Sequence, residues 1–341
     1  MFFVDDFSEE VSLKTQLSKT ALGCALFCAL FATVDLSAQM KAEKSMDNAR
    51  DYRVLGADKK RVAIVNAKGE IEWEAPNNDA REIHDIQMLP NGAVLFQTSY
   101  TTVVEMNRDK QVVWRYEAKP KEGYTGRIEI HSYQRLKNGL TMIAESGNAR
   151  LVEVDKKGQI VKEIALTIER PNAHRDTRMV RKLDNGHYLV CHEGDGKLRE
   201  YDGAGKVVWT YEMDLNGRPA SPGHGPEGHG VAVFGAIRMP NGNTMIAGGN
   251  NNRVLEVTPA GKVVWSVDQK ELPGVTLAWV TTLQLLPNGN LIIGNTHAGP
   301  DNPQLIEVTR DKKVVWTFKD FTNFGNNLVA AQALVKGKVI R

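Results

Sequence analysis

The chain of 341 residues is 42% hydrophobic, which supplies enough apolar side chain for a sizeable core, and all-β folds of this length form single domains. Its formal net charge is +2, and acidic residues alternate with basic ones along the sequence. A chain so close to neutral has no global field to attract nucleic acid or an anionic membrane, so we expect neither as a partner.

The N-terminal segment has the pattern of an export signal. Lys14 and Lys19 precede an apolar run over residues 21–34, and Leu-Ser-Ala at residues 36–38 offers a cleavage site. The run is shorter than the roughly 20 residues that a membrane-spanning helix needs. We therefore predict a signal peptide over residues 1–39, a periplasmic or secreted protein, and no stable insertion into a membrane.

The acidic segment ahead of the apolar run is unusual for a signal peptide and indicates that the true start lies further in; an uncleaved anchor is the alternative. A linker is expected at residues 40–51, followed by one domain over residues 52–341. Cys24 and Cys28 leave with the signal, so Cys191 remains alone and no internal disulfide is expected.

One sequence unit recurs through the predicted domain. It contains an apolar strand, an Asn-Gly turn, a second apolar strand, a Val-Leu-Glu-Val strand, another turn, and a strand ending in Val-Val-Trp. Asn-Gly between apolar runs is a strong hairpin signal, because both central positions of a type I′ turn need a positive φ. Each unit therefore predicts four short strands, with the tryptophan filling the gap between neighbouring sheets. The turn asparagines are Asn91, Asn138, Asn185, Asn241 and Asn288, and the tryptophans are Trp114, Trp209, Trp265 and Trp316.

The two ends of the domain share one further unit. The segment ending at Trp73 has the pattern of the last two strands of a unit, and residues 326–340 have the pattern of the first two. Joined, they would close the ring and remove exposed sheet edges. The repeats thus predict an all-β, six-bladed β-propeller of four-stranded blades; a degenerate seventh blade is the alternative.

The Leu-Pro-Asn-Gly-Asn and Glu-Val-x-x-x-Gly-Lys-Val-Val-Trp copies, together with Ile-His-Asp-Ile-Gln at residues 83–87, carry a family resemblance. In these motifs the chain resembles the quinoprotein-like (PQQ-like) β-propeller superfamily, in particular its aryl-sulfotransferase-like branch. The resemblance covers about residues 52–341. It implies sulfuryl transfer through a channel histidine, His84 or His131, with Arg175 or Arg178 stabilising the transferred charge. The chain shows no adjacent-cysteine pair of the quinone dehydrogenases, so a PQQ cofactor is not expected.

Aligning the units on their Asn-Gly turns shows which side chains would meet at the mouth of the central channel. Seven residues before the turn, three consecutive units carry His84, His131 and Arg178. Seven residues after the turn, the last two of these units carry Glu145 and His192. Both positions mark the same side of the channel as polar, so we predict one pocket, with His84, His131, Arg178 and Glu145 as catalytic residues. Four residues before the turn, a recurring glutamine is predicted to bond the neighbouring blade; its copies are Gln87, Gln134, Gln284 and Gln332.

Two long loops, residues 169–176 and 214–230, lead into the innermost strands of their blades. Long loops on a rigid scaffold are where binding concentrates, and the Gly and Pro of the second loop let backbone approach a ligand closely. The substrate-binding residues predicted from the loops and rings are Arg175, Asp176, His224, Asn295 and His297.

Histidines from separate strands, with a carboxylate, predict a divalent metal, namely Mn, Fe, Zn or Ca. The predicted ligands are His131, His174, His192 and His229, with His84 as a further candidate and Glu145 as an additional ligand or partner. Such a metal acidifies a C–H next to a carboxylate or activates water, which predicts a lyase or hydrolase acting on a polar, carbohydrate-like small molecule. Two alternatives stay open: sulfuryl transfer, and a non-catalytic propeller that binds a saccharide or a protein.

Overall fold

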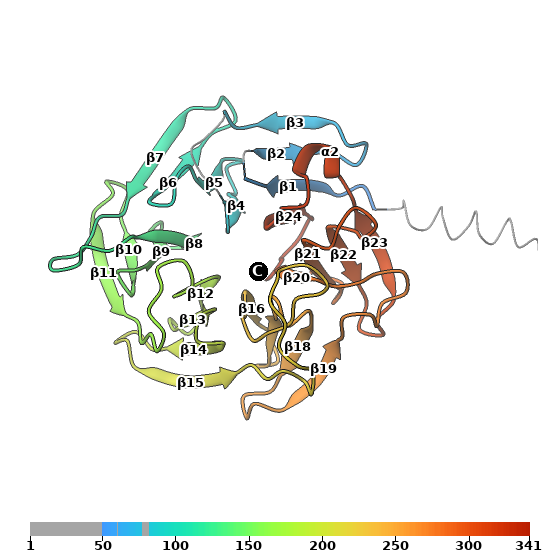
Figure 1. Ribbon diagram of the computed structural model, residues 1–341. Helices are drawn as coiled ribbons and strands as arrows, with labels where there is room; N and C mark the ends of the chain where they lie inside the picture. The colour runs from blue at the N-terminus through green and yellow to red at the C-terminus, as the bar shows by residue number, and fades with distance from the viewer. Residues whose placement is uncertain (1–49, 60, 77–81) are drawn as a thin grey trace, which may run out of the picture. The chain divides into compact units, whose positions relative to one another are not determined.

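The computed structural model describes residues 50–59, 61–76 and 82–341 (Figure 1). The predicted signal peptide, residues 1–39, lies outside the described residues, as does most of the linker predicted for residues 40–51. In the described part of the chain, no helix combines the length and the apolar character that crossing a membrane requires.

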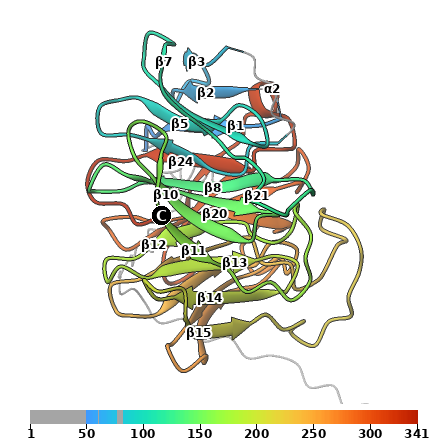
Figure 2. The ribbon, with the colours of Figure 1, turned by 90° about the vertical axis from the view of Figure 1, so that its left-hand side faces the viewer.

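The described residues form six four-stranded antiparallel sheets, arranged around a central axis as the blades of a propeller (Figure 1). One strand of each blade lies next to the axis and the last lies at the rim. Seen edge-on, the loop that follows β15 (Val207–Glu212) extends beyond the blades on one side of the ring (Figure 2). The prediction of an all-β, six-bladed propeller is confirmed.

The innermost strands are β4 (Ile86–Met88), β8 (Glu129–Arg135), β12 (Val180–Lys182), β16 (Gly235–Arg238), β20 (Trp279–Leu285) and β24 (Ala330–Leu334). The second strands are β1 (Arg53–Ala57), β5 (Val94–Gln97), β9 (Thr141–Ser146), β13 (Tyr188–His192), β17 (Thr244–Ala247) and β21 (Leu291–Thr296). The third strands are β2 (Val62–Val65), β6 (Thr102–Met106), β10 (Arg150–Val154), β14 (Lys197–Tyr201), β18 (Val254–Val257) and β22 (Leu305–Val308). The rim strands are β3 (Ile71–Glu74), β7 (Val112–Glu117), β11 (Ile160–Ala165), β15, β19 (Val263–Val267) and β23 (Val314–Phe318). A single helical turn, α2 (Phe321–Phe324), precedes β24.

The sixth blade joins the two ends of the described chain, in the order β24-β1-β2-β3. The predicted sharing of one blade is confirmed, but the division into two strands from each end is wrong. The N-terminal part supplies three strands and the C-terminal part supplies one, because β1 pairs directly with β24. Residues after β24 leave the sheet instead: Ile340 forms an isolated bridge with Leu285 of β20.

Four rim tryptophans each connect their blade to the next one. The indole Nε1 of Trp73 donates to the carbonyl oxygen of Arg108 at 3.1 Å, and that of Trp265 donates to the carbonyl oxygen of Arg310 at 2.9 Å. Trp114 and Trp209 make equivalent bonds. The guanidinium of Arg310 also lies over the Trp265 ring, 4.6 Å from its centroid. The predicted packing of tryptophan between sheets is confirmed.

The glutamines of the innermost strands bond neighbouring blades, as predicted. Each accepts a hydrogen bond from a backbone N–H of the next innermost strand, at 2.8–2.9 Å; the pairs are Gln87 with Arg135, Gln134 with Lys182, Gln284 with Ala333, and Gln332 with Met88. In the third blade Arg181 takes the place of glutamine, and its guanidinium binds both carboxylate oxygens of Asp85 across the channel, at 2.7 and 2.9 Å. These bonds hold the innermost strands in a common register around the channel.

Candidate metal centre

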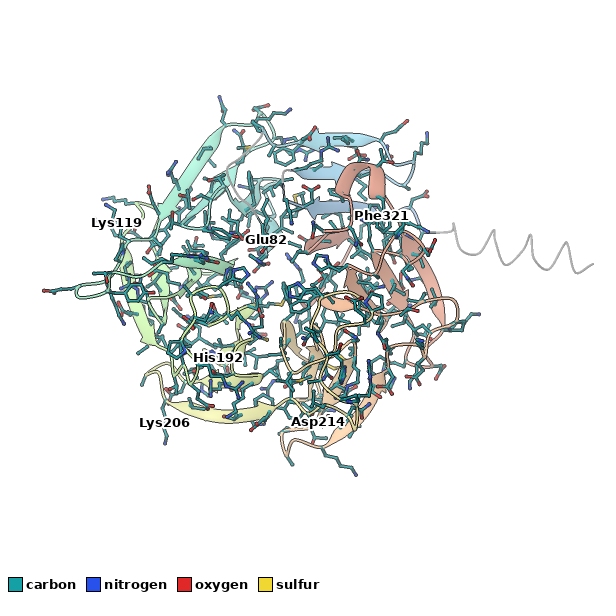
Figure 3. All side chains as sticks on the ribbon, viewed as in Figure 1. Glu82, Lys119, His192, Lys206, Asp214 and Phe321 are labelled. Atoms are coloured by element: carbon teal, nitrogen blue, oxygen red, sulfur yellow. The ribbon has the colours of Figure 1, made fainter. Side chains whose placement is uncertain are left out.

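Three histidine rings meet at one end of the channel. His84 precedes β4, His131 lies in β8, and His174 lies in the loop before β12. The ring centroids of His84 and His131 are 4.5 Å apart, those of His131 and His174 are 5.5 Å apart, and those of His84 and His174 are 6.0 Å apart. Glu82, labelled in Figure 3, lies beside the channel axis at the same place. The repeat brings these residues together because consecutive innermost strands begin at the same end of the channel.

Glu129 shares a strand face with His131. One residue separates them in β8, so both side chains point to the same side of the sheet. The carboxylate Oε2 of Glu129 lies 3.0 Å from Nε2 of His131, and the carbonyl oxygen of Thr177 lies 2.8 Å from Nδ1. Both neighbours of the ring are hydrogen-bond acceptors, whereas a neutral imidazole has one N–H to donate.

Burial, with Arg178 and His174 nearby, holds the pKa of His131 well below its ordinary value, which favours the neutral ring. If the N–H of Nδ1 satisfies Thr177, Nε2 presents its lone pair to the Glu129 carboxylate. Two lone pairs at 3.0 Å repel each other unless a cation lies between them.

His174 completes a group of three metal-ligand atoms. Its Nδ1 lies 2.7 Å from Oε2 of Glu129, and the ligand atoms of Glu129, His131 and His174 all lie within 4.8 Å of one another. Burial and the nearby Arg178 lower the pKa of His174. Glu129 and His131 are buried, whereas His174 is partly exposed, so the group can be reached from solvent. One carboxylate and two neutral imidazoles form a donor set that suits Zn, Fe or Mn.

A second Glu-His pair lies beside the first. The carboxylate of Glu82 lies 3.2 Å from Nε2 of His84, and Nη1 of Arg178 lies 3.4 Å from the same nitrogen. The hydrogen bond from His84, together with His174 and Arg178, lowers the pKa of Glu82 to about 2. Burial, His131 and Arg178 hold the pKa of His84 well below its ordinary value. The pair is therefore a carboxylate beside a neutral imidazole, whose Nδ1 is buried without a partner among the described residues.

The carboxylate of Glu193 accepts hydrogen bonds from two arginines beside the histidine cluster. Arg178 donates its Nε to one carboxylate oxygen of Glu193, and Arg175 donates to the other at 2.9 Å. Of the predicted catalytic residues, the structure thus brings His84, His131 and Arg178 together, and it places the predicted substrate-binding Arg175 next to Arg178 through their shared carboxylate.

An open pocket of about 1030 Å³ adjoins the three-ligand group. Glu82, Glu129 and His174 form one part of its wall, and Tyr100 and Tyr124 contribute aromatic rings. The Tyr100 and His174 centroids are 6.5 Å apart, in an edge-to-face arrangement. Arg127, whose side chain is 71% exposed, forms an ion pair with Glu129 at the pocket wall. The pocket therefore offers ring faces, a guanidinium and the ligand group to one occupant.

Glu145 does not join this site, contrary to the prediction. In the β8–β9 pairing it lies opposite Ile130, so its side chain points to the other face of the sheet from Glu129 and His131. There its carboxylate is buried and accepts three hydrogen bonds at 2.5–2.7 Å, from Tyr116, Asn148 and Arg150. This set of bonds is structural.

His192 is also separate from the site, although it was predicted as a ligand. Its Nδ1 lies 2.8 Å from the carbonyl oxygen of Asp176, and its Nε2 lies 3.0 Å from the hydroxyl of Tyr201. Both nitrogens are thus occupied within the blade, and burial lowers the pKa of His192 to about 4. His229, the other predicted ligand, lies with Nε2 3.0 Å from the carbonyl oxygen of Leu215. Neither belongs to the group of ligand atoms found among the described residues.

Two predicted substrate-binding residues bond the backbone instead. The buried carboxylate of Asp176 accepts from the N–H groups of Asn172 at 2.6 Å and Gly147 at 2.9 Å. The buried amide of Asn295 accepts from the N–H of Ala278 at 2.8 Å and donates to carbonyl oxygens. Both residues shape loops at the mouth.

His224 and His297 form a separate group at the mouth. The His224 ring lies 4.3 Å from Trp279 and 5.7 Å from His297 by their centroids. Burial and His224 lower the pKa of His297 to about 4. Phe234 lies 6.5 Å from both Trp279 and His84, so a row of rings connects this group to the three-histidine cluster.

Glu82 and Glu129 are the site residues that the sequence prediction missed. The signal was present: Glu-Ile-His occurs at residues 82–84 and again at 129–131, in equivalent places of two consecutive units. Because side chains alternate along a strand, a Glu two residues before a His lies on the same face.

No protein-family model matches the chain, and no curated protein matches it. Among solved structures, a protein of unknown function from Bacteroides caccae is 24% identical; the match covers 83% of this chain and 98% of that chain, with a TM-score of 0.67. Streptogramin B lyase is 13% identical over 80% of this chain and 85% of that chain, with a TM-score of 0.54. The WD40 β-propeller domain of Doa1 is 15% identical over 75% and 74%, with a TM-score of 0.52. These similarities show that the fold is that of β-propellers, and the aryl-sulfotransferase-like branch stays a prediction.

Proposed function

We propose that the protein is an exported, divalent-metal-dependent enzyme of the lyase or hydrolase type, acting on a polar, carbohydrate-like small molecule at the channel mouth. One observation carries the proposal: Nε2 of His131 and Nδ1 of His174 lie 3.0 and 2.7 Å from the same carboxylate oxygen of Glu129. A divalent cation would satisfy all three groups at once.

The donor set favours Mn, Fe or Zn over Ca, because Ca²⁺ prefers oxygen ligands whereas two of the three donors are imidazoles. Three protein ligands leave coordination positions for water or substrate. When bound, the metal would polarise a substrate carboxylate or carbonyl, or lower the pKa of a bound water.

The residues around the group supply the remaining chemistry. His84 is a neutral imidazole beside the cluster, so it can accept a proton from a substrate C–H or from water, and Glu82 then stabilises the imidazolium. Tyr100 and Tyr124 offer ring faces against which a sugar can lie, and the exposed guanidinium of Arg127 suits a carboxylate on the substrate. Streptogramin B lyase shares the fold at low identity, which is compatible with lyase chemistry on a propeller. The proposed reaction type rests on the residues of the site, because a fold alone does not specify a reaction.

Elemental analysis tests the metal. Purified protein, incubated with Mn²⁺, Fe²⁺ or Zn²⁺ and freed of excess ion, should retain about one equivalent, and Glu129→Gln and His174→Asn should lose it. His187→Asn is the matched control, because this histidine bonds Glu200 in another part of the third blade and should leave metal content unchanged. A protein that retains no ion under all three conditions overturns the proposal.

Activity separates the reaction types. Acidic and neutral oligosaccharides are incubated with the metal-loaded protein, and new carbon–carbon double bonds (lyase) and new reducing ends (hydrolase) are followed. His84→Gln should lower kcat by about 10²- to 10⁴-fold with metal content unchanged, as expected for loss of an acid–base group. Transfer from an aryl sulfate by metal-free protein would instead support the sulfuryl-transfer alternative.

A further inference from the structure

The turn at the end of β24 departs from the other five. In the five complete units the turn holds Asn-Gly, and the asparagine side chain accepts a bond from the backbone N–H two residues on, as Asn288 does from Asn290 at 3.0 Å. The shared blade has Lys336-Gly337-Lys338 at the equivalent place. Gly337 keeps the positive φ, at 100°, so the turn is preserved while two lysines are added. Both lysines are exposed, and neither forms an ion pair with a described residue.

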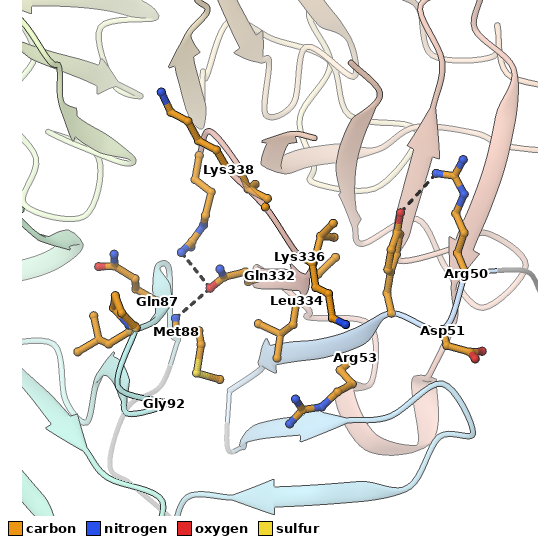
Figure 4. Close-up of a pocket in the computed structure, with 18 of the residues that line it drawn as sticks. Arg50, Asp51, Arg53, Gln87, Met88, Gly92, Gln332, Leu334, Lys336 and Lys338 are labelled. Carbon is orange, nitrogen blue, oxygen red and sulfur yellow. Dashed lines mark hydrogen bonds between the residues drawn. The ribbon is translucent and has the colours of Figure 1, made fainter. Parts of the chain in front are cut away.

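These lysines border a pocket of about 1210 Å³ at the seam of the ring (Figure 4). The pocket forms where residues 50–53, 87–92 and 332–341 meet, because the chain leaves the sheet after β24 and the N-terminal strand β1 takes the next place. Lys336 and Lys338 leave the turn in opposite directions, so their ammonium groups flank it (Figure 4).

The pocket carries an excess of positive charge. Arg53 and Arg108 line it with the two lysines, and Asp51 is the only acidic residue among its described lining. Arg108 lies over the Trp73 ring, 5.6 Å from its centroid, and has no carboxylate partner among the described residues. Arg53 pairs with Glu72 at 2.6 Å. Two further lining arginines are committed elsewhere, Arg50 to Glu307 and Arg341 to Gln332.

The pocket floor is apolar. Met88, Leu334, Val335 and Val339 are partly buried, and each packs with one side against a core cluster while the other side lines the pocket. An open pocket with an apolar floor and unpaired cations at its rim is complementary to a molecule with an apolar body and one anionic group.

We propose that this pocket binds an amphiphilic organic anion, with its oxyanion group at one of the rim cations Lys336, Lys338 and Arg108 and an apolar part on the floor. The site lies at the opposite end of the innermost strands from the histidines, since His84 precedes β4 whereas residues 87–92 end it and form its turn. It is therefore a second ligand site, independent of the proposed metal-dependent activity.

Calorimetric titration of the full chain with hexyl phosphate, inorganic phosphate and hexanol tests the proposal. Hexyl phosphate should bind at least tenfold more tightly than inorganic phosphate, as expected for burial of about two or more methylene groups. The double variant Lys336→Glu/Lys338→Glu should raise the Kd for hexyl phosphate by about tenfold or more, because a charge-assisted bond is lost and the charge of the rim is reversed.

The matched control is Lys156→Glu/Lys157→Glu, which makes the same change in net charge at exposed positions of another blade and should change the Kd less than twofold. If the double Glu variant unfolds, as judged by its thermal midpoint, Lys336→Ala/Lys338→Ala replaces it. Equal affinity for hexyl phosphate and inorganic phosphate, or an unchanged Kd in the lysine variants, overturns the proposal.

Discussion

The carboxylate oxygen of Glu129 lies 3.0 Å from Nε2 of His131, on the same face of strand β8, while the other ring nitrogen of His131 faces a carbonyl oxygen. A neutral imidazole cannot satisfy two acceptors. With the proton on Nδ1, the contact between Nε2 and Glu129 is therefore unfavourable in the metal-free protein and favourable around a cation, so the metal-free fold is less stable at the proposed site.

The change Glu129→Gln should therefore stabilise the metal-free protein. The new amide N–H can donate to Nε2 of His131, and the repulsion disappears; the lost ion pair with the exposed Arg127 contributes little. We expect the free energy of unfolding in urea, with a chelator present, to rise by about 1 kcal/mol. A lower free energy of unfolding than in the wild type would mean that Glu129 serves the fold and not a metal.

Glu145→Gln should have the opposite effect. This buried carboxylate holds Arg150 at 2.7 Å, and a neutral amide would leave the buried guanidinium with only the more exposed carboxylate of Glu163 as its charge partner. We expect a loss of about 3 kcal/mol in the free energy of unfolding and unchanged metal content. The two Glu→Gln variants differ in position but not in chemistry, so each is the other's control. Loss of metal in Glu145→Gln would contradict its placement on the far face of the sheet.

Stability should fall on acidification through His192. Its folded-state pKa is about 4, below the ordinary 6.5, so the folded state binds fewer protons than the unfolded state between these values. Its contribution is thus complete above about pH 6.5 and is lost as the pH falls toward 4, by roughly 3 kcal/mol in total.

Urea unfolding at pH 7.5, 5.5 and 4.5 measures this loss, with a chelator present throughout. His192→Gln should be less stable than the wild type at pH 7.5 but should lose less stability on acidification. Parallel curves for the two proteins would show that His192 does not titrate differently in the folded and unfolded states.

The glutamines that join neighbouring innermost strands around the channel should contribute measurably to the free energy of unfolding. Gln284 is buried and accepts from the N–H of Ala333 at 2.8 Å and donates to its carbonyl oxygen at 3.2 Å. Gln284→Ala removes both bonds, although the carbonyl oxygen of Ala333 still accepts from the N–H of Val335 at 3.1 Å, and the expected cost is about 2 kcal/mol. Gln111→Ala, at an exposed rim turn, is the control and should change the free energy of unfolding by less than about 0.5 kcal/mol. Equal effects of the two changes would mean that the hydrogen bonds of Gln284 to the neighbouring blade do not stabilise the fold.

The sequence by itself determined the propeller. Asn-Gly turns and alternating apolar residues act within a few neighbours of the chain, so four strands per unit and six units follow from local rules. The tryptophans and glutamines were also predictable, because one contact repeated at the unit period must join neighbouring blades.

The tertiary structure decided which polar side chains form the site. Distance from a turn places a residue along the channel, but the pairing register decides the face of the sheet on which its side chain lies. Hence Glu145, opposite Ile130, lies away from His131. Glu129 instead occupies the place beside His131 that was predicted for Glu145. His174 lies in a loop without regular pairing, so no periodicity could place its ring nitrogen 2.7 Å from Glu129. Such contacts between blades depend on how the ring closes, and ring closure is a property of the whole chain.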